Sequence, residues 1–382
     1  MADRLNRILN APHAPLPLRL ARVSLAALAH LHHAVLLLWM MPFAIGLRPR
    51  HRLARPVVSV GNLTSGGTGK TPFTILVCRA AQRLGAKPAV LIRGYRGKFE
   101  HGCEVVSDGE HVLLSPTEAG DEAVLLALEL PGVPVLVGRD RRKTGAMAIR
   151  EFDPDLLVLD DGMQFLQLHR DLDIALLDLA RPFDNGWMLP RGMLREPPSH
   201  LRRVDAVVLT CSPGAGACTD ATTEADVRVH APSATLLHAF VSAHQLRRLN
   251  HGADADVSGM SGRKAVLVSA IAQPERFHAL ARALGMDVVF VEHHADHNPI
   301  SAEQWQQVCS KAMRAGADMV VTTAKDAVKA RSLPPDPPIY SLDIRLQAQE
   351  ALELDRMLQC LLSRGNAAFA NAPLPADVGE AH

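Results

Sequence analysis

The chain has 382 residues, 48% of them apolar, which is enough for two domains that each bury a core. Its 41 Lys and Arg residues nearly balance 40 Asp and Glu residues. That balance argues against a protein that coats nucleic acid, which would carry a strong basic excess. None of the six cysteines stands at CxxC spacing, so neither a zinc site nor a redox motif is indicated.

The first predicted element is an apolar helix within residues 1–47. Val23 to Leu47 contains no Asp, Glu, Lys or Arg, and about 20 apolar residues suffice to cross a bilayer. Arginines flank the run on both sides, at Arg4, Arg7, Arg19, Arg22, Arg48, Arg50, Arg52 and Arg55. This symmetry fits a helix that lies in or dips into one leaflet, and it leaves open whether the helix spans. A buried core helix is the alternative.

A phosphate-binding loop follows. Pro56 to Val60 reads as a buried strand, the next residues are rich in glycine, and Phe73 to Leu84 reads as a helix that ends before Gly85. Strand, glycine-rich loop, Gly-Lys-Thr and helix together are the P-loop context. The candidate ATP-binding residues are Thr64, Ser65, Gly66, Gly67, Thr68, Gly69, Lys70 and Thr71. Lys70 would reach the β- and γ-phosphates, and the Thr71 hydroxyl would bind Mg²⁺.

A second apolar strand, Asp155 to Leu159, ends in the acidic pair Asp160 and Asp161. A strand that ends in Asp is typical of the second carboxylate on the Mg²⁺ side of a P-loop enzyme. The sequence leaves open which of the two faces the metal.

Further along, Ser115 to Glu118 reads as a capping box that opens a helix toward Leu130. Asp121 and Glu122 fall in the early turns of that helix, where they can simply complement the helix dipole. Several arginines, among them Arg93 and Arg141, either are solvated or hold an anionic headgroup, because the guanidinium fork matches phosphate oxygens.

Strand and helix patterns alternate from Val57 to about Leu209 and again after a small polar loop. The second set predicts strands over 265–269, 287–291 and 319–322, helices over 274–284 and 301–315, and an extended segment over 236–249. This alternation predicts an α/β fold: a P-loop NTPase-like, mostly parallel sheet domain with a second, smaller α/β domain. We expect a membrane-associated helix over 1–47, a P-loop kinase domain over 48–235, the smaller domain over 236–345, and a C-terminal helix and disordered tail over 346–382.

Three stretches occur in one order: Gly61 to Pro72, Asp160 to Gln164, and Leu189-Pro190-Arg191-Gly192-Met193-Leu194-Arg195-Glu196-Pro197. Together they resemble the tetraacyldisaccharide 4'-kinase family, over most of the chain to about residue 345. Shorter matches are Arg93-Gly94-Tyr95, Gly120-Asp121-Glu122, Asp296-His297 and Thr323-Ala324-Lys325-Asp326. The chain departs from the family at Ala324, where members tend to carry an acid, and at His294, where they tend to carry an aromatic residue.

The resemblance implies an ATP-dependent lipid kinase that transfers the γ-phosphate to the 4'-hydroxyl of a tetraacylated glucosamine disaccharide 1-phosphate, in lipid A and lipopolysaccharide biosynthesis. It implies ATP and Mg²⁺ as cofactors, an anionic acylated disaccharide lipid as substrate, and a place on the cytoplasmic face of a bacterial inner membrane. No obligate protein partner is indicated.

Roles follow for individual residues. Lys70, Asp121 and His297 are the candidate catalytic residues, with Asp121 and His297 as a proton-accepting pair. Spacing alone does not pair them, and Asp121 as a helix cap beside a surface His297 is the alternative. Thr71, Asp160 and Asp161 are the candidate metal ligands. The candidate lipid-binding residues are Arg93, Tyr95, Glu122, Arg141, Arg195 and Glu196.

Two other functions compete with this interpretation. A membrane-associated switch ATPase shares the Gly-Gly-x-Gly-Lys-Thr loop but places a Lys before the glycine pair, where this chain has Ser65. A GTP-binding module needs an Asn-Lys-x-Asp motif, and the nearest stretch, Thr323 to Asp326, lacks the Asn.

Overall fold

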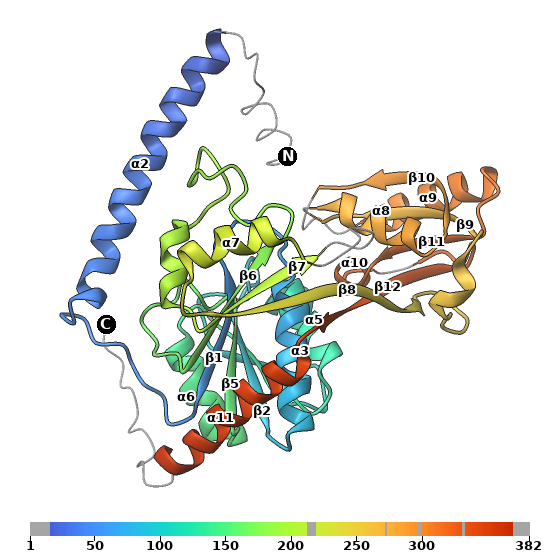
Figure 1. The fold of residues 1–382 in the computed structure, drawn as a ribbon. Helices are drawn as coiled ribbons and strands as arrows, with labels where there is room; N and C mark the ends of the chain where they lie inside the picture. Colours follow the sequence, from blue (N-terminus) through green and yellow to red (C-terminus); the bar gives the residue numbers. More distant parts are fainter. Residues whose placement is uncertain (1–15, 212–218, 272, 296–299, 331–332, 370–382) are drawn as a thin grey trace.

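The computed structural model describes residues 16–211, 219–271, 273–295, 300–330 and 333–369 (Figure 1). His297 and the tail beyond Phe369 therefore lie outside the described residues. The strands in chain order are β1 (Val57–Asn62), β2 (Pro88–Ile92), β3 (Glu104–Ser107), β4 (Val135–Val137), β5 (Leu156–Asp160), β6 (Leu172–Asp178), β7 (Ala206–Cys211), β8 (Thr235–Arg248), β9 (Lys264–Ser269), β10 (Asp287–His293), β11 (Met319–Thr323) and β12 (Ile339–Ala348).

All of these strands join one sheet, in the order β10-β9-β11-β12-β8-β7-β6-β1-β5-β2-β4-β3. The pairs are parallel except β3 with β4 and β12 with β8. The predicted mostly parallel α/β sheet is therefore confirmed.

Helices cover both faces of this sheet. The helices of the described residues, in chain order, are α2 (Leu16–Ala44), α3 (Lys70–Arg83), α4 (Pro116–Ala119), α5 (Asp121–Glu129), α6 (Arg141–Phe152), α7 (Ala221–His230), α8 (Pro274–Ala283), α9 (Ala302–Arg314), α10 (Ala324–Ala327) and α11 (Ala351–Phe369), with short 3-10 helices at Pro198–Arg203 and Val257–Met260. One apolar cluster joins the strands to α3, α5 and α11, and another joins the opposite face to α6.

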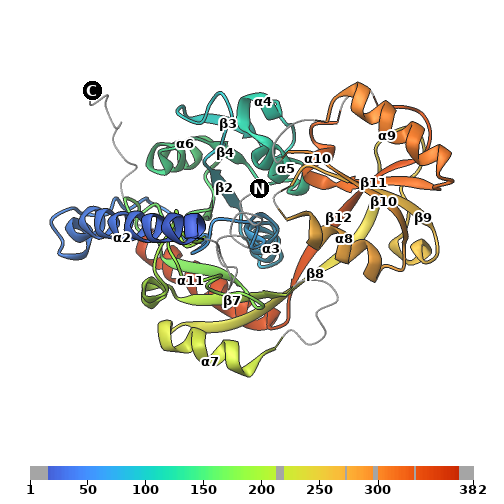
Figure 2. The same ribbon diagram turned by 90° about the horizontal axis from the view of Figure 1, so that it is seen from above.

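The molecule has two lobes, which Figure 2 shows side by side. We call residues 51–248 and 346–369 the first lobe and residues 249–345 the second lobe, in each case the described part. The long antiparallel pair of β8 and β12 links them, with partners from Tyr340 and Arg248 to Ala348 and Ala239. In the second lobe, α8 and α9 pack on opposite faces of the sheet, in separate apolar clusters. The predicted extended segment over 236–249 is thus confirmed as β8.

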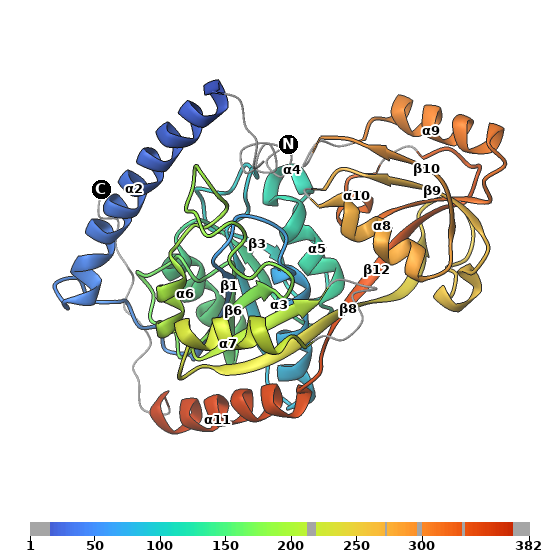
Figure 3. The same ribbon diagram turned by 45° about the horizontal axis from the view of Figure 1, so that its top comes forward.

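The helix α11 returns the chain to the first lobe, where Figure 3 shows it below the sheet. Leu354 and Leu358 of α11 lie in the same buried cluster as Phe73 and Val77 of α3. The predicted C-terminal helix is present and is part of the first lobe's core. The domain boundaries at 47, 235 and 345 stay a prediction.

The helix after the phosphate-binding loop begins at Lys70, three residues before the predicted start. Gly69 caps it with a left-handed backbone, at φ 86°. Pro72 is compatible with this earlier start, because the N–H groups of the first helical turn have no partner within the helix, so a proline there costs no hydrogen bond. The helix therefore presents Lys70 and Thr71 directly at its N-terminus.

The N-terminal helix α2 stands along one side of the body in Figure 1. Pro17–Ala44 is long and apolar enough to cross a membrane by length and composition, and only 6% of its most apolar window is buried. It touches the body at a few points: Ala29 joins an apolar cluster of the first lobe, and His32 Nδ1 lies 3.0 Å from the Leu189 carbonyl oxygen. Most of its apolar side chains face away from the protein.

Candidate active site

The phosphate-binding loop connects β1, at the centre of the sheet, to α3. Thr64, Ser65, Gly66, Gly67, Thr68, Gly69, Lys70 and Thr71 all lie in this loop or at the helix start. Asn62 ties the loop internally, because its amide donates to the Thr68 hydroxyl at 2.8 Å and to the Gly66 carbonyl at 3.4 Å. Asn62 is a site residue that our sequence reasoning missed, although it belongs to the Gly61 to Thr64 stretch that carried the family resemblance.

Asp160 ends β5, directly beside Val60 of β1 in the sheet register. Its carboxylate accepts hydrogen bonds from the Thr71 hydroxyl at 3.2 Å and the Thr74 hydroxyl at 2.8 Å. Burial, with the nearby carboxylates of Glu122 and Asp161, raises the pKa of Asp160 to about 7. A buried carboxylate of this kind is stabilised in its charged form by a cation.

Asp161 turns away from Asp160 because its backbone is left-handed, at φ 55°. The Arg195 guanidinium donates two hydrogen bonds to the Asp161 carboxylate, at 2.9 and 3.0 Å, and Lys70 Nζ lies 3.8 Å from Asp161 Oδ1. Desolvation opposes the charged form, yet the cations Lys70 and Arg195 hold the pKa of Asp161 well below its usual value. The two acidic residues thus have different partners, a distinction that the sequence did not make.

The stretch Leu189–Pro197 packs against the phosphate-binding loop. The Ser65 amide donates to the Met193 carbonyl at 2.6 Å, and the Arg195 amide donates to the Leu63 carbonyl at 2.7 Å. Glu196 is 2% exposed and accepts hydrogen bonds from Arg203 at 2.7 and 2.9 Å. In this position Glu196 fixes the loop that carries Arg195.

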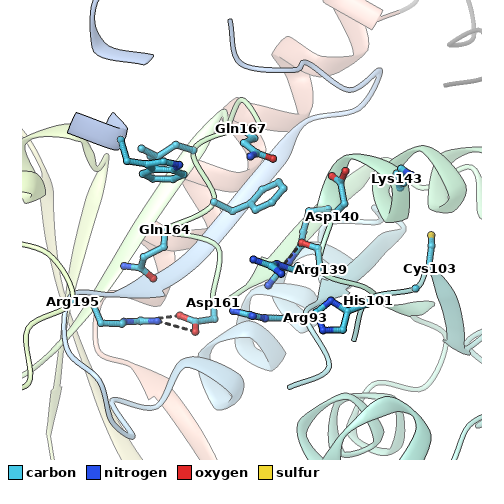
Figure 4. Close-up of a pocket in the computed structure, with 15 residues that line it drawn as sticks. Arg93, His101, Cys103, Arg139, Asp140, Lys143, Asp161, Gln164, Gln167 and Arg195 are labelled. Carbon is cyan, nitrogen blue, oxygen red and sulfur yellow. Dashed lines mark hydrogen bonds and ion pairs between the residues drawn. The ribbon is translucent and has the colours of Figure 1, made fainter. Parts of the chain in front are cut away.

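A cavity of about 750 Å³ opens on the far side of Asp161 (Figure 4). Its lining includes five cationic side chains, Arg93, Arg139, Arg141, Lys143 and Arg195, against the two carboxylates of Asp140 and Asp161, and it includes Trp39 of α2. Burial and the neighbouring Arg93 lower the pKa of Arg141 to about 10, so it stays charged at neutral pH. The cavity suits an anion that is attached to an apolar body.

The remaining predicted site residues lie at two other places. Tyr95 is 55% exposed, outside the lining of this cavity. Asp121 and Glu122 begin α5 and face the second lobe: Lys329 Nζ lies 2.9 Å from Asp121, and Lys325 Nζ lies 3.3 Å from Glu122. The described residues thus do not test the pairing of Asp121 with His297.

The second lobe also contacts the phosphate-binding loop. Arg276 of α8 donates to the Gly67 carbonyl at 3.1 Å and forms an ion pair with Asp178 at the end of β6. Gln273, which precedes α8, lies against Gly66. Arg276, Lys325 and Lys329 were not in the predicted site because nothing local in the sequence shows which part of the first lobe they meet.

Comparison with known proteins identifies relatives over nearly the whole chain. The family model described as tetraacyldisaccharide-1-P 4'-kinase matches residues 21–363. A tetraacyldisaccharide 4'-kinase of Geobacter metallireducens is 41% identical over 307 residues, 78% of this chain and 88% of the relative. One of Geobacter sulfurreducens is 39% identical over 349 residues, 90% of this chain and 94% of the relative.

A solved structure is also similar. It is described as an "apo" form of LpxK from Aquifex aeolicus in complex with ATP, and it superposes with a TM-score of 0.72 at 26% identity. The superposition covers 90% of this chain and 99% of that one.

Proposed function

This chain belongs to the tetraacyldisaccharide-1-P 4'-kinase family, and from that premise we propose how its residues divide the work of the reaction. It is a lipid A 4'-kinase, an enzyme that transfers the γ-phosphate of ATP to the 4'-hydroxyl of a tetraacylated disaccharide 1-phosphate. One observation carries the assignment of roles. Lys70 and Arg195 both contact Asp161, so the nucleotide loop and the arginine-rich cavity meet at a single carboxylate.

ATP binds in the loop of Thr64 to Thr71. The N–H groups at the start of α3 surround the phosphate oxygens, and the helix N-terminus adds favourable partial charge. Lys70, held between Asn62 Oδ1 at 3.2 Å and Asp161, is placed to neutralise charge on the transferred phosphate.

Thr71, Asp160 and Asp161 suit Mg²⁺. Among the described residues there is no cluster of three or more His, Cys, Asp or Glu side chains that would hold a metal by itself. Mg²⁺ does not need one, because it keeps waters and substrate phosphates as ligands beside one or two carboxylates. The buried Asp160 carboxylate, whose hydrogen-bond donors are the neutral hydroxyls of Thr71 and Thr74, supports this site. Bound there, Mg²⁺ would neutralise negative charge on the nucleotide phosphates.

The cavity beside Asp161 receives the lipid headgroup. Arg93 and Arg141 offer forked donors to its phosphate, and Arg195 joins this cavity to the Asp161 carboxylate. Glu196 fixes the loop that carries Arg195. The proposal that Tyr95 and Glu122 contact the lipid rests on the family resemblance, because both residues lie outside the lining of this cavity. Trp39 in the lining supports an approach of the acyl chains along α2.

Asp121 accepts the proton of the 4'-hydroxyl, with His297 as its partner. The hydroxyl O–H bond breaks, its oxygen bonds to the γ-phosphorus, and the bond from that phosphorus to the β-bridging oxygen breaks to leave ADP. A carboxylate close to the nucleotide loop is a suitable acceptor for such a proton. The start of α5 packs beside the helix that follows the nucleotide loop, because Ala123 and Val124 lie in the same apolar cluster as Phe73 of α3, and this packing supports the proposal.

We further propose that α2 holds the enzyme at the cytoplasmic face of the inner membrane. Exposed apolar side chains along α2, including Leu31, Val35 and Leu38, support contact with lipid acyl chains. The arginines that follow α2 suit anionic headgroups.

The test is phosphorylation of a tetraacyl disaccharide 1-phosphate in detergent micelles, with labelled ATP and mapping of the new phosphate. We expect a 4'-phosphorylated lipid and a raised KM for an acceptor that lacks the 1-phosphate. ATP hydrolysis at the same rate with and without lipid, and no phosphorylated lipid, would contradict the kinase and favour a switch ATPase.

A further inference from the structure

A lysine of the second lobe reaches the proposed proton acceptor of the first. Lys329 Nζ lies 2.9 Å from Asp121 Oδ2, and the two side chains are only 9% and 13% exposed. The neighbouring pair of Lys325 and Glu122 is looser, at 3.3 Å, with the glutamate 44% exposed. The inner pair is therefore the one shielded from solvent, where the attraction between charges is stronger.

The backbone that carries Lys329 is fixed from both lobes. Val328 packs in the apolar cluster of the first lobe that includes Ala123 and Leu126 of α5. Asp326 is held within the second lobe, because its carboxylate accepts hydrogen bonds from the Thr323 hydroxyl at 2.7 Å and the Ala270 amide at 3.0 Å. The position of Lys329 beside Asp121 is thus fixed by the packing of Val328 and by the hydrogen bonds of Asp326.

We propose that Lys329 is a positioning residue for proton transfer, whose ammonium holds the Asp121 carboxylate ionised and in one orientation toward the acceptor hydroxyl. This role rests on the proposed function of Asp121 as the proton acceptor. When the 4'-hydroxyl gives up its proton, Asp121 accepts it and becomes a neutral carboxylic acid. Because the pair joins α5 to the segment after α10, the acceptor is set only while the two lobes are in contact there.

The experiment compares Lys329→Met, Lys329→Gln, Lys329→Arg, Asp121→Asn and the double variant Asp121→Asn/Lys329→Met in the micelle assay. We expect the Met and Gln variants to lose about 10- to 100-fold in kcat, part of what a positioned base contributes. Their KM for ATP should stay within about twofold, since Lys329 does not belong to the nucleotide loop. Arg keeps the charge and should restore most of the turnover.

The surface variant Lys311→Met is the matched control. Lys311 pairs with Glu292 at 3.0 Å, a similar distance, but it is 50% exposed and lies at the far end of the second lobe. It should keep wild-type kcat. The double variant should be no slower than Asp121→Asn alone, because Lys329 acts through Asp121.

Melting curves identify the variants that fold. If Lys329→Met does not fold, Lys329→Gln is the neutral variant to be compared. A folded neutral variant with wild-type kcat, beside a strongly impaired Asp121→Asn, would overturn the role of Lys329. The role would also be overturned if the kcat of the double variant fell by the product of the losses in the two single variants. Wild-type turnover in Asp121→Asn alone would instead remove Asp121 as the proton acceptor, and the proposed function would fail at that residue.

Discussion

The ammonium group of Lys70 lies among polar atoms of the nucleotide loop and not in the hydrophobic core. Its side chain is 17% exposed and contacts polar atoms of Asn62 and Asp161. We expect Lys70→Ala to lose at least about 100-fold in kcat, the size of effect seen when one donor to a charged transition state is removed. The melting temperature should stay within a few degrees of wild type.

Lys87→Ala, at an exposed lysine after the same helix, is the control and should keep full activity. If folded Lys70→Ala turns over near the wild-type rate, the assignment of the phosphate-binding loop is wrong.

The buried Glu196 carboxylate predicts how the free energy of unfolding depends on pH. Burial favours its protonated form, but hydrogen bonds from His200 and Arg203 hold its pKa at about 2, against 4.5 for an ordinary glutamate. A pKa that is lower in the folded state stabilises the fold above pH 4.5, and this contribution is lost as the pH falls from 4.5 toward 2. The difference corresponds to about 3 kcal/mol at neutral pH.

We therefore expect Glu196→Gln to lower the free energy of unfolding by up to about 3 kcal/mol at pH 7, with a smaller loss at pH 4. Urea unfolding in detergent at several pH values measures it, and Glu110→Gln, at an exposed position, is the control. A loss that is the same at pH 4 and pH 7 would show that the Glu196 charge is not what stabilises the loop.

At the residue scale, the sequence predicted which types of side chain gather at the site but not which of them touch. The acidic pair after β5 was identified, yet its division between Thr71 and Arg195 follows from the left-handed backbone of Asp161. Gln164 was passed over, although its amide donates to the Asn62 carbonyl and to Glu196, both at 3.0 Å. Such contacts join segments about 100 and 30 residues apart, so no local pattern shows them.

At the scale of elements, substitutions in α2 test the proposal that this helix holds the enzyme at the membrane. Leu31 and Leu38 are 60% and 67% exposed, so replacing both by Ser removes apolar surface without opening the core. Burial of one Leu side chain is worth about 1.5–3 kcal/mol, and 1.4 kcal/mol is tenfold in a partition constant. We expect Leu31→Ser/Leu38→Ser to bind vesicles at least about 10-fold more weakly and to show a raised KM for the lipid.

Sedimentation with anionic vesicles measures the binding. Leu352→Ser, at a 76% exposed leucine of α11, is the matched control and should pellet like wild type. Full pelleting of the α2 variant would show that another surface anchors the enzyme.

Elements with a strong local pattern were predicted closely. The second lobe's predicted strand over 287–291 is β10 (Asp287–His293), and its predicted helix over 301–315 is α9, which begins with a capping box at Ser301. The start of α3 lies three residues before the predicted one, because the left-handed Gly69 cap is not visible in the sequence.

At the scale of the whole molecule, the sequence predicted two α/β units but not that they share one sheet. The pairing of β8 with β12 brings together residues about 90 to 110 positions apart and joins the two lobes, and Arg276 of the second lobe contacts the nucleotide loop. Hydrophobic alternation fixes which residues form a strand, but it does not choose the partner strand.

The contact of Arg276 with the nucleotide loop tests whether the lobes act together. Its guanidinium donates to the Gly67 carbonyl at 3.1 Å and pairs with Asp178, and the two charged side chains are 26% and 21% exposed. Solvent screens a pair of this exposure, so its contribution is about 1 kcal/mol. We expect Arg276→Met to raise the KM for ATP about fivefold and to speed hydrogen exchange of the amides in residues 63–69, because the second lobe no longer holds the loop.

Arg282→Met, at an exposed arginine of the same helix, should change neither quantity. Asp178→Asn should weaken ATP binding in the same way, and the double variant should be little worse than either single one, because both act through one contact. If Arg276→Met keeps the ATP KM and the exchange rates of Arg282→Met, the second lobe does not support the nucleotide loop through Arg276, and the coupling of the lobes rests on other contacts such as the β8–β12 pair and the α5–α10 face.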